Sequence, residues 1–257
     1  MENDNNMPDL ENISIDNLIN ANIDFNEIPR IILKQICDKY NLYDELVEIT
    51  ISNTKLDTKN IKDYPLMVGK EILIKSYFKG CSGDAFTDKP TEYRGTIGNL
   101  IKNGSNPEIV ATLNGILRYY NIAEKTIHCK GDTPEKCAKV LVDFLKIINP
   151  KKVGIIGFQP AFIKYVGENF NAVGSDLNPD NIGKVKYGVK IIDGKDNEKI
   201  IKECDIILAT GSTIVNGTFW DIYKLAKRYN KRIIFYGTSI SGLSEILGIE
   251  RFCKYGL

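Results

Sequence analysis

Short apolar segments alternate with helix-forming segments through the second half of the chain. This pattern predicts strands at residues 153–157, 172–176, 189–193, 205–210 and 232–236, and helices at 161–169, 198–203, 219–229 and 241–247. Strands that are apolar along their whole length, with helices between them, are typical of a parallel sheet covered on both faces. We therefore predict an α/β fold over residues 131–257, a Rossmann-like parallel sheet with helices on both faces.

The first half of the chain has a different pattern. It predicts helices at 13–42, 106–120 and 132–148, and two antiparallel strands at 46–51 and 71–78. Asn26 and Asn106 are candidate helix caps, each followed by a proline in the first turn. The Gly-, Thr- and Asp-rich stretch 80–98 is predicted to be a long functional loop. These elements indicate a smaller α+β lobe over residues 13–130, after a disordered tail at 1–12.

Composition narrows the range of partners. Lys and Arg (34) nearly balance Asp and Glu (33), so we expect no nucleic-acid partner. No apolar run approaches the roughly 18 residues of a membrane span, and the N-terminus lacks the pattern of a signal peptide. The six cysteines contain no CxxC pair, which favours reduced thiols and a cytoplasmic protein. With one histidine, His128, a zinc site or a serine triad is disfavoured.

Candidate chemistry gathers where the predicted parallel strands end, because ligands of such sheets bind at that edge. The first strand is followed by Gly157, Phe158, Gln159 and Pro160. A pyrophosphate needs glycines and free backbone N–H groups, which Phe158 and Pro160 do not supply. The loop therefore disfavours NAD and favours a phosphate-free adenosine ligand, S-adenosylmethionine. A plain strand-to-helix turn is the alternative.

Asp176 ends the second strand, 19 positions after Gly157. A carboxylate there can accept hydrogen bonds from both ribose hydroxyls, or it can cap the turn before Pro179. Asp193, after the third strand, is a candidate for the adenine side or for a helix cap. The expected cofactor contacts are Gly157, Phe158, Gln159, Pro160, Asp176, Leu177, Asn178, Asp193, Ala209 and Gly211.

The fourth and fifth strands end in hydroxyl-rich loops. Thr210, Ser212, Thr213 and Asn216 stand where a substrate or the methionine part of the cofactor would lie. Gly237, Thr238 and Ser239 precede a helix and could bind a carboxylate through backbone N–H groups, although helix capping explains them equally well. His128, on a predicted strand, is more typical of a packed core or edge residue than of a catalytic base.

The stretches GFQPAF, SDLNPDNIG, CDIILATGSTIVNGT and GTS resemble the Rossmann-like family of heavy-metal chelation domains. The resemblance covers about residues 150–245 and implies an enolase-like N-terminal lobe. The chain also resembles the methyltransferases of iron-guanylylpyridinol cofactor biosynthesis in methanogens. That resemblance implies C-methylation of a small hydroxypyridinol by S-adenosylmethionine. Small cytoplasmic enzymes of this class are commonly symmetric dimers, so we expect a homodimer or a larger homo-oligomer.

If that resemblance holds, the substrate ring is already nucleophilic, so catalysis is alignment with the methyl group and hydrogen bonding to the ring oxyanion. Thr210, Ser212, Thr213 and Asn216 would hold the substrate, Asp84 and Thr87 would cover it from the other lobe, and no metal is required. One rival is a non-catalytic protein that chelates a metal or a metal–organic ligand. The other is an NAD(P)-dependent oxidoreductase.

Overall fold

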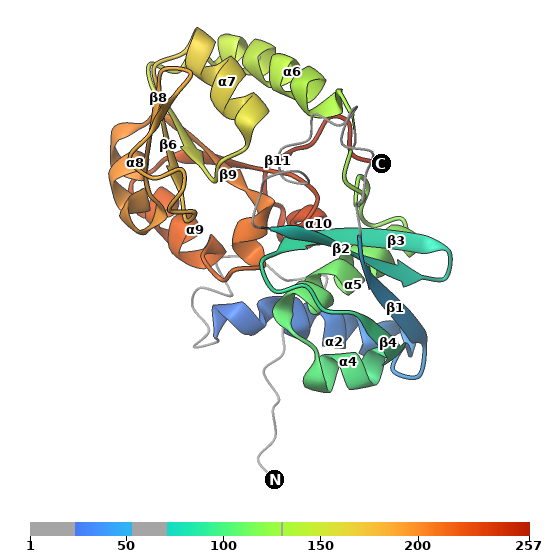
Figure 1. Cartoon of the computed structure of the whole chain (residues 1–257). Coiled ribbons are helices and arrows are strands. Elements are labelled where there is room, and N and C mark those ends of the chain that lie inside the picture. Colours follow the sequence, from blue (N-terminus) through green and yellow to red (C-terminus); the bar gives the residue numbers. More distant parts are fainter. Residues whose placement is uncertain (1–23, 53–70, 130) are drawn as a thin grey trace.

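The computed structural model describes residues 24–52, 71–129 and 131–257. Within these ranges the first half of the chain forms an antiparallel sheet and the second half a mostly parallel one (Figure 1). The predicted tail at residues 1–12 lies outside the described residues.

The antiparallel sheet has the strand order β3-β2-β1-β4. Its strands are β1 (Leu46–Ile51), β2 (Ile72–Phe78), β3 (Cys81–Thr87) and β4 (Tyr93–Thr96). The helices of this half are α2 (Ile28–Tyr40), α4 (Ile97–Asn103) and α5 (Asn106–Tyr119), and a 3-10 turn, η2 (Phe25–Glu27), precedes α2. The predicted antiparallel pairing of β1 with β2 is confirmed, with Glu48 opposite Tyr77.

Residues 80–98 are not the long loop that their composition predicts, because they form β3, β4 and the start of α4. The glycines and small residues of β3 serve close packing instead. A Cβ atom on Gly83 would lie 2.3 Å from the backbone nitrogen of Gly115 in α5. Only glycine allows the helix to lie this close to the strand.

Two predicted helix caps are also wrong by one position. Helix α2 begins after Glu27 rather than at Asn26. Asn106 is the first residue of α5, and the preceding Ser105 donates its backbone N–H to Glu108 at 2.6 Å in a capping box. Asparagine and serine are both good caps, so a sequence that contains them side by side does not fix the boundary.

The second sheet has the order β11-β10-β9-β5-β6-β8-β7. Its strands are β5 (Val153–Ile156), β6 (Ala172–Asp176), β7 (Val185–Lys186), β8 (Val189–Asp193), β9 (Ile206–Thr210), β10 (Arg232–Tyr236) and β11 (Arg251–Phe252). All neighbours pair parallel except β7 with β8. The predicted parallel strands are confirmed. The edge strands β7 and β11 are too short to give a periodic signal.

Numbering the parallel strands in chain order gives 6-5-4-1-2-3 across the sheet, so the progression reverses between β5 and β9. The connecting helices are α6 (Thr133–Ile148), α7 (Pro160–Asn169), α8 (Asn197–Glu203), α9 (Phe219–Arg228) and α10 (Ser241–Leu247), with 3-10 turns η3 (Gly194–Asp196) and η4 (Gly211–Ile214). Ligands of open α/β sheets bind at the carboxyl ends of the strands near such a reversal.

Apolar side chains of the central strand β9 pack on both faces of this sheet. Ile206 and Leu208 belong to the cluster of α6 and α7, whereas Ile207 and Ala209 belong to the cluster of α8 and α9. In Figure 1, α6 and α7 lie together above the sheet and α8 and α9 lie at the opposite side. The predicted cover of helices on both faces is therefore present.

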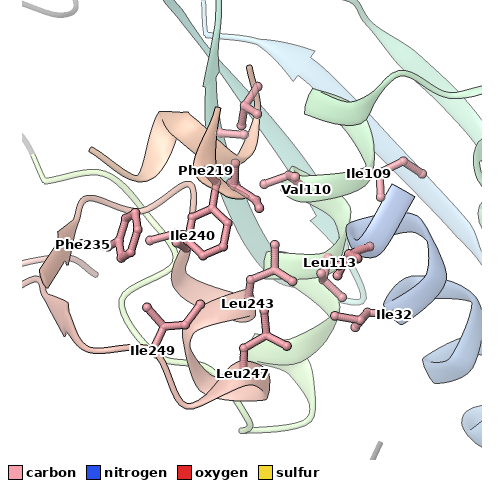
Figure 2. Close-up of a cluster of buried hydrophobic side chains, with 14 of the residues drawn as sticks. Ile32, Ile109, Val110, Leu113, Phe219, Phe235, Ile240, Leu243, Leu247 and Ile249 are labelled. Atoms are coloured by element: carbon pink, nitrogen blue, oxygen red, sulfur yellow. The ribbon is translucent and has the colours of Figure 1, made fainter. Parts of the chain in front are cut away.

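The larger apolar cluster joins the two halves of the chain (Figure 2). Leu113 of α5 packs with Ile240 and Leu243, which precede and belong to α10, and Phe219 and Phe235 continue the cluster toward the parallel sheet. The two sheets lie on either side of residue 130 in sequence, but their cores are continuous. The predicted division into domains at that residue stays a prediction.

Candidate functional site

A cavity of about 380 Å³ lies at the carboxyl ends of β5, β6, β9 and β10. The loops after these four strands supply one part of its wall, at Gly157, Asp176, Thr210 and Gly237. The other part comes from Glu71, Phe86, Asp88 and His128, which belong to the first half of the chain. The cavity is therefore built between the predicted ligand-binding edge and the antiparallel sheet.

The loop after β5 offers few free backbone donors to an anion. Gly157 adopts φ +91°, and a Cβ there would lie 2.5 Å from Cγ2 of Thr210. The side chain of Gln159 caps helix α7 by accepting the Phe162 N–H at 2.6 Å, and Pro160 occupies the first turn without an N–H. Because Pro160 has no N–H and the Phe162 N–H is already bonded, this helix N-terminus offers few of the free N–H groups that bind a phosphate.

Asp176 lines the cavity and also organises its own turn. Its Oδ1 accepts the N–H groups of Leu177 at 2.7 Å and Asn178 at 3.2 Å, and its Oδ2 accepts the Asn181 amide at 2.6 Å. Asp176 therefore does cap its own turn, as the alternative interpretation predicts. A carboxylate offers roughly four lone-pair sites, so one remains for a ligand hydroxyl. Ribose binding by Asp176 stays a prediction.

Glu71 is the acidic residue that sequence reasoning missed. Its carboxylate accepts a hydrogen bond from the Ser212 hydroxyl at 3.0 Å. Burial raises the pKa of Glu71, and the negative charges of Asp176 and Asp88 raise it further, against the lowering effect of the Ser212 hydrogen bond. All three carboxylates line the cavity. A ligand that brings a hydrogen-bond donor or a positive charge to Glu71 would be stabilised there.

The loop after β9 places its hydroxyls as predicted, at the cavity wall. Thr210 precedes the 3-10 turn η4, and Thr213 donates its hydroxyl to the Thr210 carbonyl at 2.7 Å. Asn216 accepts both the backbone N–H and the hydroxyl of Thr218, at 3.1 and 2.7 Å. Thr210, Gly211, Ser212, Thr213 and Asn216 all line the cavity, and what they bind stays a prediction.

The loop after β10 is held by a residue of the other half of the chain. The Asn114 amide of α5 donates to the carbonyl oxygens of Thr238 and Ser239, both at 3.1 Å. The Ser239 hydroxyl accepts the Phe86 N–H from β3 at 3.1 Å. Gly237, Thr238 and Ser239 line the cavity as predicted. Carboxylate binding by their N–H groups is untested.

Several predicted site residues do not line the cavity. Asp84 is fully buried in β3, where it pairs with Lys75 and accepts the His128 N–H at 2.8 Å. Thr87 is buried and accepts the Lys89 N–H. Both residues lie in a strand rather than in the predicted loop, so their predicted role over the site is wrong.

Three predicted cofactor contacts also lie off the cavity wall. Asp193 caps the turn η3 by accepting the Lys195 N–H at 2.9 Å, which is the alternative that its sequence position left open. Ala209 is fully buried within β9 and Pro160 lies in the first turn of α7. Gly157, Phe158, Gln159, Leu177 and Asn178 do line the cavity.

One wall of the cavity carries sulfur and aromatic side chains that the sequence did not single out. Cys129, Cys137, Cys253 and Phe252 line it. His128 also lines it and contacts the Phe86 ring edge-on, with ring centroids 5.0 Å apart, in a segment without the predicted strand. None of the six cysteines, which all lie within the described residues, forms a disulfide. These residues come from separate segments, so no spacing in the sequence marks them.

Tyr236 closes the end of β10 against the first loop. Its hydroxyl donates to the Gly157 carbonyl at 3.0 Å, and its ring packs on Phe162 at a centroid distance of 4.8 Å. Burial raises the pKa of Tyr236, with a further contribution from the charge of Asp176, so this phenol remains a neutral donor.

Among the residues that the structure describes, no group of three or more His, Cys, Asp or Glu side chains is placed to hold a metal ion. In the same ranges no helix has the length and apolarity required to cross a membrane.

Comparison with known protein families gives a match within the second half of the chain. Residues 140–249 match the model of the DUF364 family, described as "Putative heavy-metal chelation". A segment of 29 residues is 69% identical to the uncharacterized protein MJ1125 of Methanocaldococcus jannaschii and spans 11% of this chain and 48% of that protein. The matched segment thus spans about half the length of this curated relative.

Two solved structures of DUF364 proteins of unknown function are similar to this chain. The protein from Pyrococcus horikoshii is 17% identical, with a TM-score of 0.49 over 84% of this chain and 80% of that chain. The protein from Desulfitobacterium hafniense is 13% identical, with a TM-score of 0.44 over 67% and 70%. The segment that matches the family model, residues 140–249, contains the loops after β5, β6, β9 and β10 that line the cavity.

Proposed function

We propose that the cavity binds one small, phosphate-free organic molecule, and that the protein acts on or carries a metal complex of such a molecule. The observation that carries this proposal is the cavity itself, which combines the carboxylates of Glu71 and Asp176 with apolar walls at the carboxyl edge of the sheet. The match of residues 140–249 to a family described by heavy-metal chelation supports the metal.

The organic part of the ligand follows from the donor groups. A bare metal ion is normally held by three or four protein ligands. The described residues gather no such group, so the remaining donors would come from an organic chelator. Glu71, Asp88 or the thiols of Cys129 and Cys253 could add one or two donors from the cavity wall. The protein would then recognise the complex mainly by its shape and its polar edge.

The size of the cavity and the structure of the loop after β5 limit the ligand further. A cavity of about 380 Å³ falls near the lower end of the range for small-molecule sites, about 300–1,000 Å³. This volume suits one ligand better than a cofactor together with a second substrate. The side-chain cap on helix α7 and Pro160 argue against any nucleotide that must place a pyrophosphate after β5.

A second candidate function is the S-adenosylmethionine-dependent methylation of a small hydroxypyridinol, as in HcgC-type enzymes. The observation that favours it is the place of Asp176, at the end of the strand next to β5, in a sheet whose parallel strands follow the order of Rossmann-like dinucleotide-binding folds. Asp176 would hold the ribose, and the hydroxyls of Thr210, Ser212 and Thr213 would orient the acceptor ring. Glu71, bonded to Ser212, could accept the proton of a ring hydroxyl.

Calorimetric titration of the full chain tests both proposals. The probes are iron(III) chelated by 3-hydroxypyridin-4-one, nickel(II) alone, S-adenosylhomocysteine and NAD. Saturable binding of the iron complex, with weaker or no binding of nickel alone, is the result expected for the first proposal. Binding of nickel alone at the same site, without binding of the complex, would overturn it. Binding of NAD with low-micromolar affinity would contradict the exclusion of pyrophosphate.

Asp176→Ala tests the second candidate. If Asp176 holds a ribose, the affinity for S-adenosylhomocysteine falls by about 1.5–3 kcal/mol, the value of hydrogen bonds to a charged group. Asp193→Ala is the matched control, because Asp193 ends the neighbouring strand in register with Asp176 but lies off the cavity. Equal affinity of both variants for S-adenosylhomocysteine would show that Asp176 is only a turn residue.

A further inference from the structure

The cavity wall is acidic in the part that the structure describes. Three carboxylates, Glu71, Asp88 and Asp176, line the cavity, whereas no described lysine or arginine does. Within the described ranges none of these three carboxylates forms an ion pair with a basic side chain. Carboxylates that share a site without a cation repel one another. A ligand that brings a positive charge would offset this repulsion.

Glu71 has a carboxylate oxygen that a ligand can reach. Its Oε2 accepts the Ser212 hydroxyl at 3.0 Å. Its Oε1 accepts no hydrogen bond from the described residues, and protein atoms do not enclose it. Asp176, in contrast, already accepts three hydrogen bonds within its own turn. Glu71 is therefore the cavity carboxylate with an accessible and unused oxygen.

The ionisation of Glu71 depends on what lies beside it. Burial raises the pKa of Glu71, the Ser212 hydrogen bond opposes this, and the charges of Asp176 and Asp88 raise the pKa further. The ionised form is therefore disfavoured as long as only protein groups surround the carboxyl group. A cation beside Oε1 favours the ionised form and lowers the pKa again. The site thus gains from a positively charged ligand what it lacks in basic side chains.

Aromatic rings form another part of the same wall. Phe86, Phe158, Phe162, Tyr236 and Phe252 line the cavity. The face of an aromatic ring attracts a cation, most strongly where both are shielded from water. A bare divalent ion would instead need several protein ligands, and the described residues gather no group of three or more His, Cys, Asp or Glu placed to supply them. Rings and a carboxylate together suit a cation with an organic body.

We propose that the ligand of the cavity carries a positive charge and that its charged group contacts Oε1 of Glu71. This inference rests on the proposed function, because it names the class of molecule that the cavity takes. An organic ammonium or sulfonium ion and a positively charged metal complex share this chemistry. A neutral or negatively charged ligand of the same shape binds more weakly, because it leaves the carboxylates to repel one another.

The test is calorimetric titration of the full chain, at neutral pH, with ligands of matched shape and different charge. Choline, 3,3-dimethylbutan-1-ol and 3,3-dimethylbutanoate are a cation, its neutral isostere and an anion of similar size. S-adenosylmethionine is compared with S-adenosylhomocysteine. The cationic one-to-one complex of iron(III) with 3-hydroxypyridin-4-one is compared with free 3-hydroxypyridin-4-one. The last comparison separates a metal complex from an organic cation as the source of the charge.

Glu71→Gln removes the charge and keeps the shape of the side chain. Asp88→Asn is the second variant, because Asp88 is an exposed residue on the cavity wall. Asp193→Asn is the matched control, since it removes the same charge from a residue that lies off the cavity and keeps an oxygen to accept the Lys195 N–H. We expect the wild type to bind a cation about 10-fold or more tightly than its neutral partner, the value of one charge-assisted hydrogen bond.

Glu71→Gln should lose most of this preference, Asp88→Asn about 2- to 3-fold of it, and Asp193→Asn none of it. A neutral or anionic ligand that binds as tightly as the matched cation would overturn the inference while leaving the proposed function in place. The same preference in Glu71→Gln as in the wild type would also overturn it. If Glu71→Gln does not fold, an unchanged preference in Asp88→Asn has that meaning. If the wild type binds none of the probes, the proposed function fails and the inference fails with it.

Discussion

The loss of Asn114 should destabilise this protein sharply, because Asn114 connects α5 to the cavity loop. Its amide nitrogen lies 3.0 Å from the Asp84 carbonyl and 3.1 Å from the carbonyls of Thr238 and Ser239. Its amide oxygen accepts the Gly242 N–H at 2.8 Å. The side chain is 1% exposed, so water does not replace these contacts easily.

The cost of Asn114→Ala follows from the groups left behind. The Thr238 carbonyl keeps its two bonds from Ser241, so three groups lose the Asn114 contact without another hydrogen bond in place: the carbonyls of Asp84 and Ser239 and the N–H of Gly242. An unsatisfied buried group costs about 1–3 kcal/mol. Because some water will enter the space that the side chain leaves, we expect the lower end of the sum, a loss of about 3–5 kcal/mol.

The assay is equilibrium unfolding in urea followed by circular dichroism. Asn169→Ala is the control, since Asn169 is exposed and donates only to the Tyr165 carbonyl near the end of α7, so its loss should change stability by less than about 0.5 kcal/mol. A loss below about 1 kcal/mol for Asn114→Ala would refute the reasoning, because that value corresponds to a single net hydrogen bond rather than to three orphaned groups.

Two further predictions concern the cavity itself. Gly157→Ala should lower the free energy of unfolding by about 2–4 kcal/mol in the same urea titration, because Gly157 adopts φ +91° and a Cβ there would lie 2.5 Å from Thr210. Gly183→Ala, at φ +81° in open space, should lower it by only about 1 kcal/mol. Equal losses for the two variants would contradict the role of the contact with Thr210. Folding raises the pKa of Glu71 above its ordinary value of 4.5, so the free energy of unfolding should fall as pH rises from 4.5 through the folded pKa. Glu71→Gln should remove this fall, and at higher pH the variant should be more stable than the wild type. Urea midpoints measured from pH 4.5 to 8 check this, and the same decline in both proteins would contradict it.

The sequence by itself determined the parallel half of the fold. Its strands are short, wholly apolar and separated by helices. These features follow from burial of each strand on both faces of the sheet, so they can be recognised in the local sequence of each segment. The residues at the ends of the strands followed from the same pattern, because parallel strands bring their carboxyl ends to one edge. The pattern alone therefore predicts that Gly157, Asp176, Ser212 and Thr238 share the ligand-binding edge, and all four line the cavity.

Tertiary structure alone decided the rest of the site. Glu71 meets Ser212 across 141 positions of sequence, and Asn114 meets Thr238 across 124, distances over which no local pattern carries information. Glycine-rich composition predicted a loop at Asp84, whereas close packing of β3 on α5 required the same glycines in a strand. Periodicity records whether a side chain is buried, but only the packing of distant elements decides which groups it meets. In this protein that packing brings Glu71 to Ser212 and Asn114 to the Thr238 carbonyl.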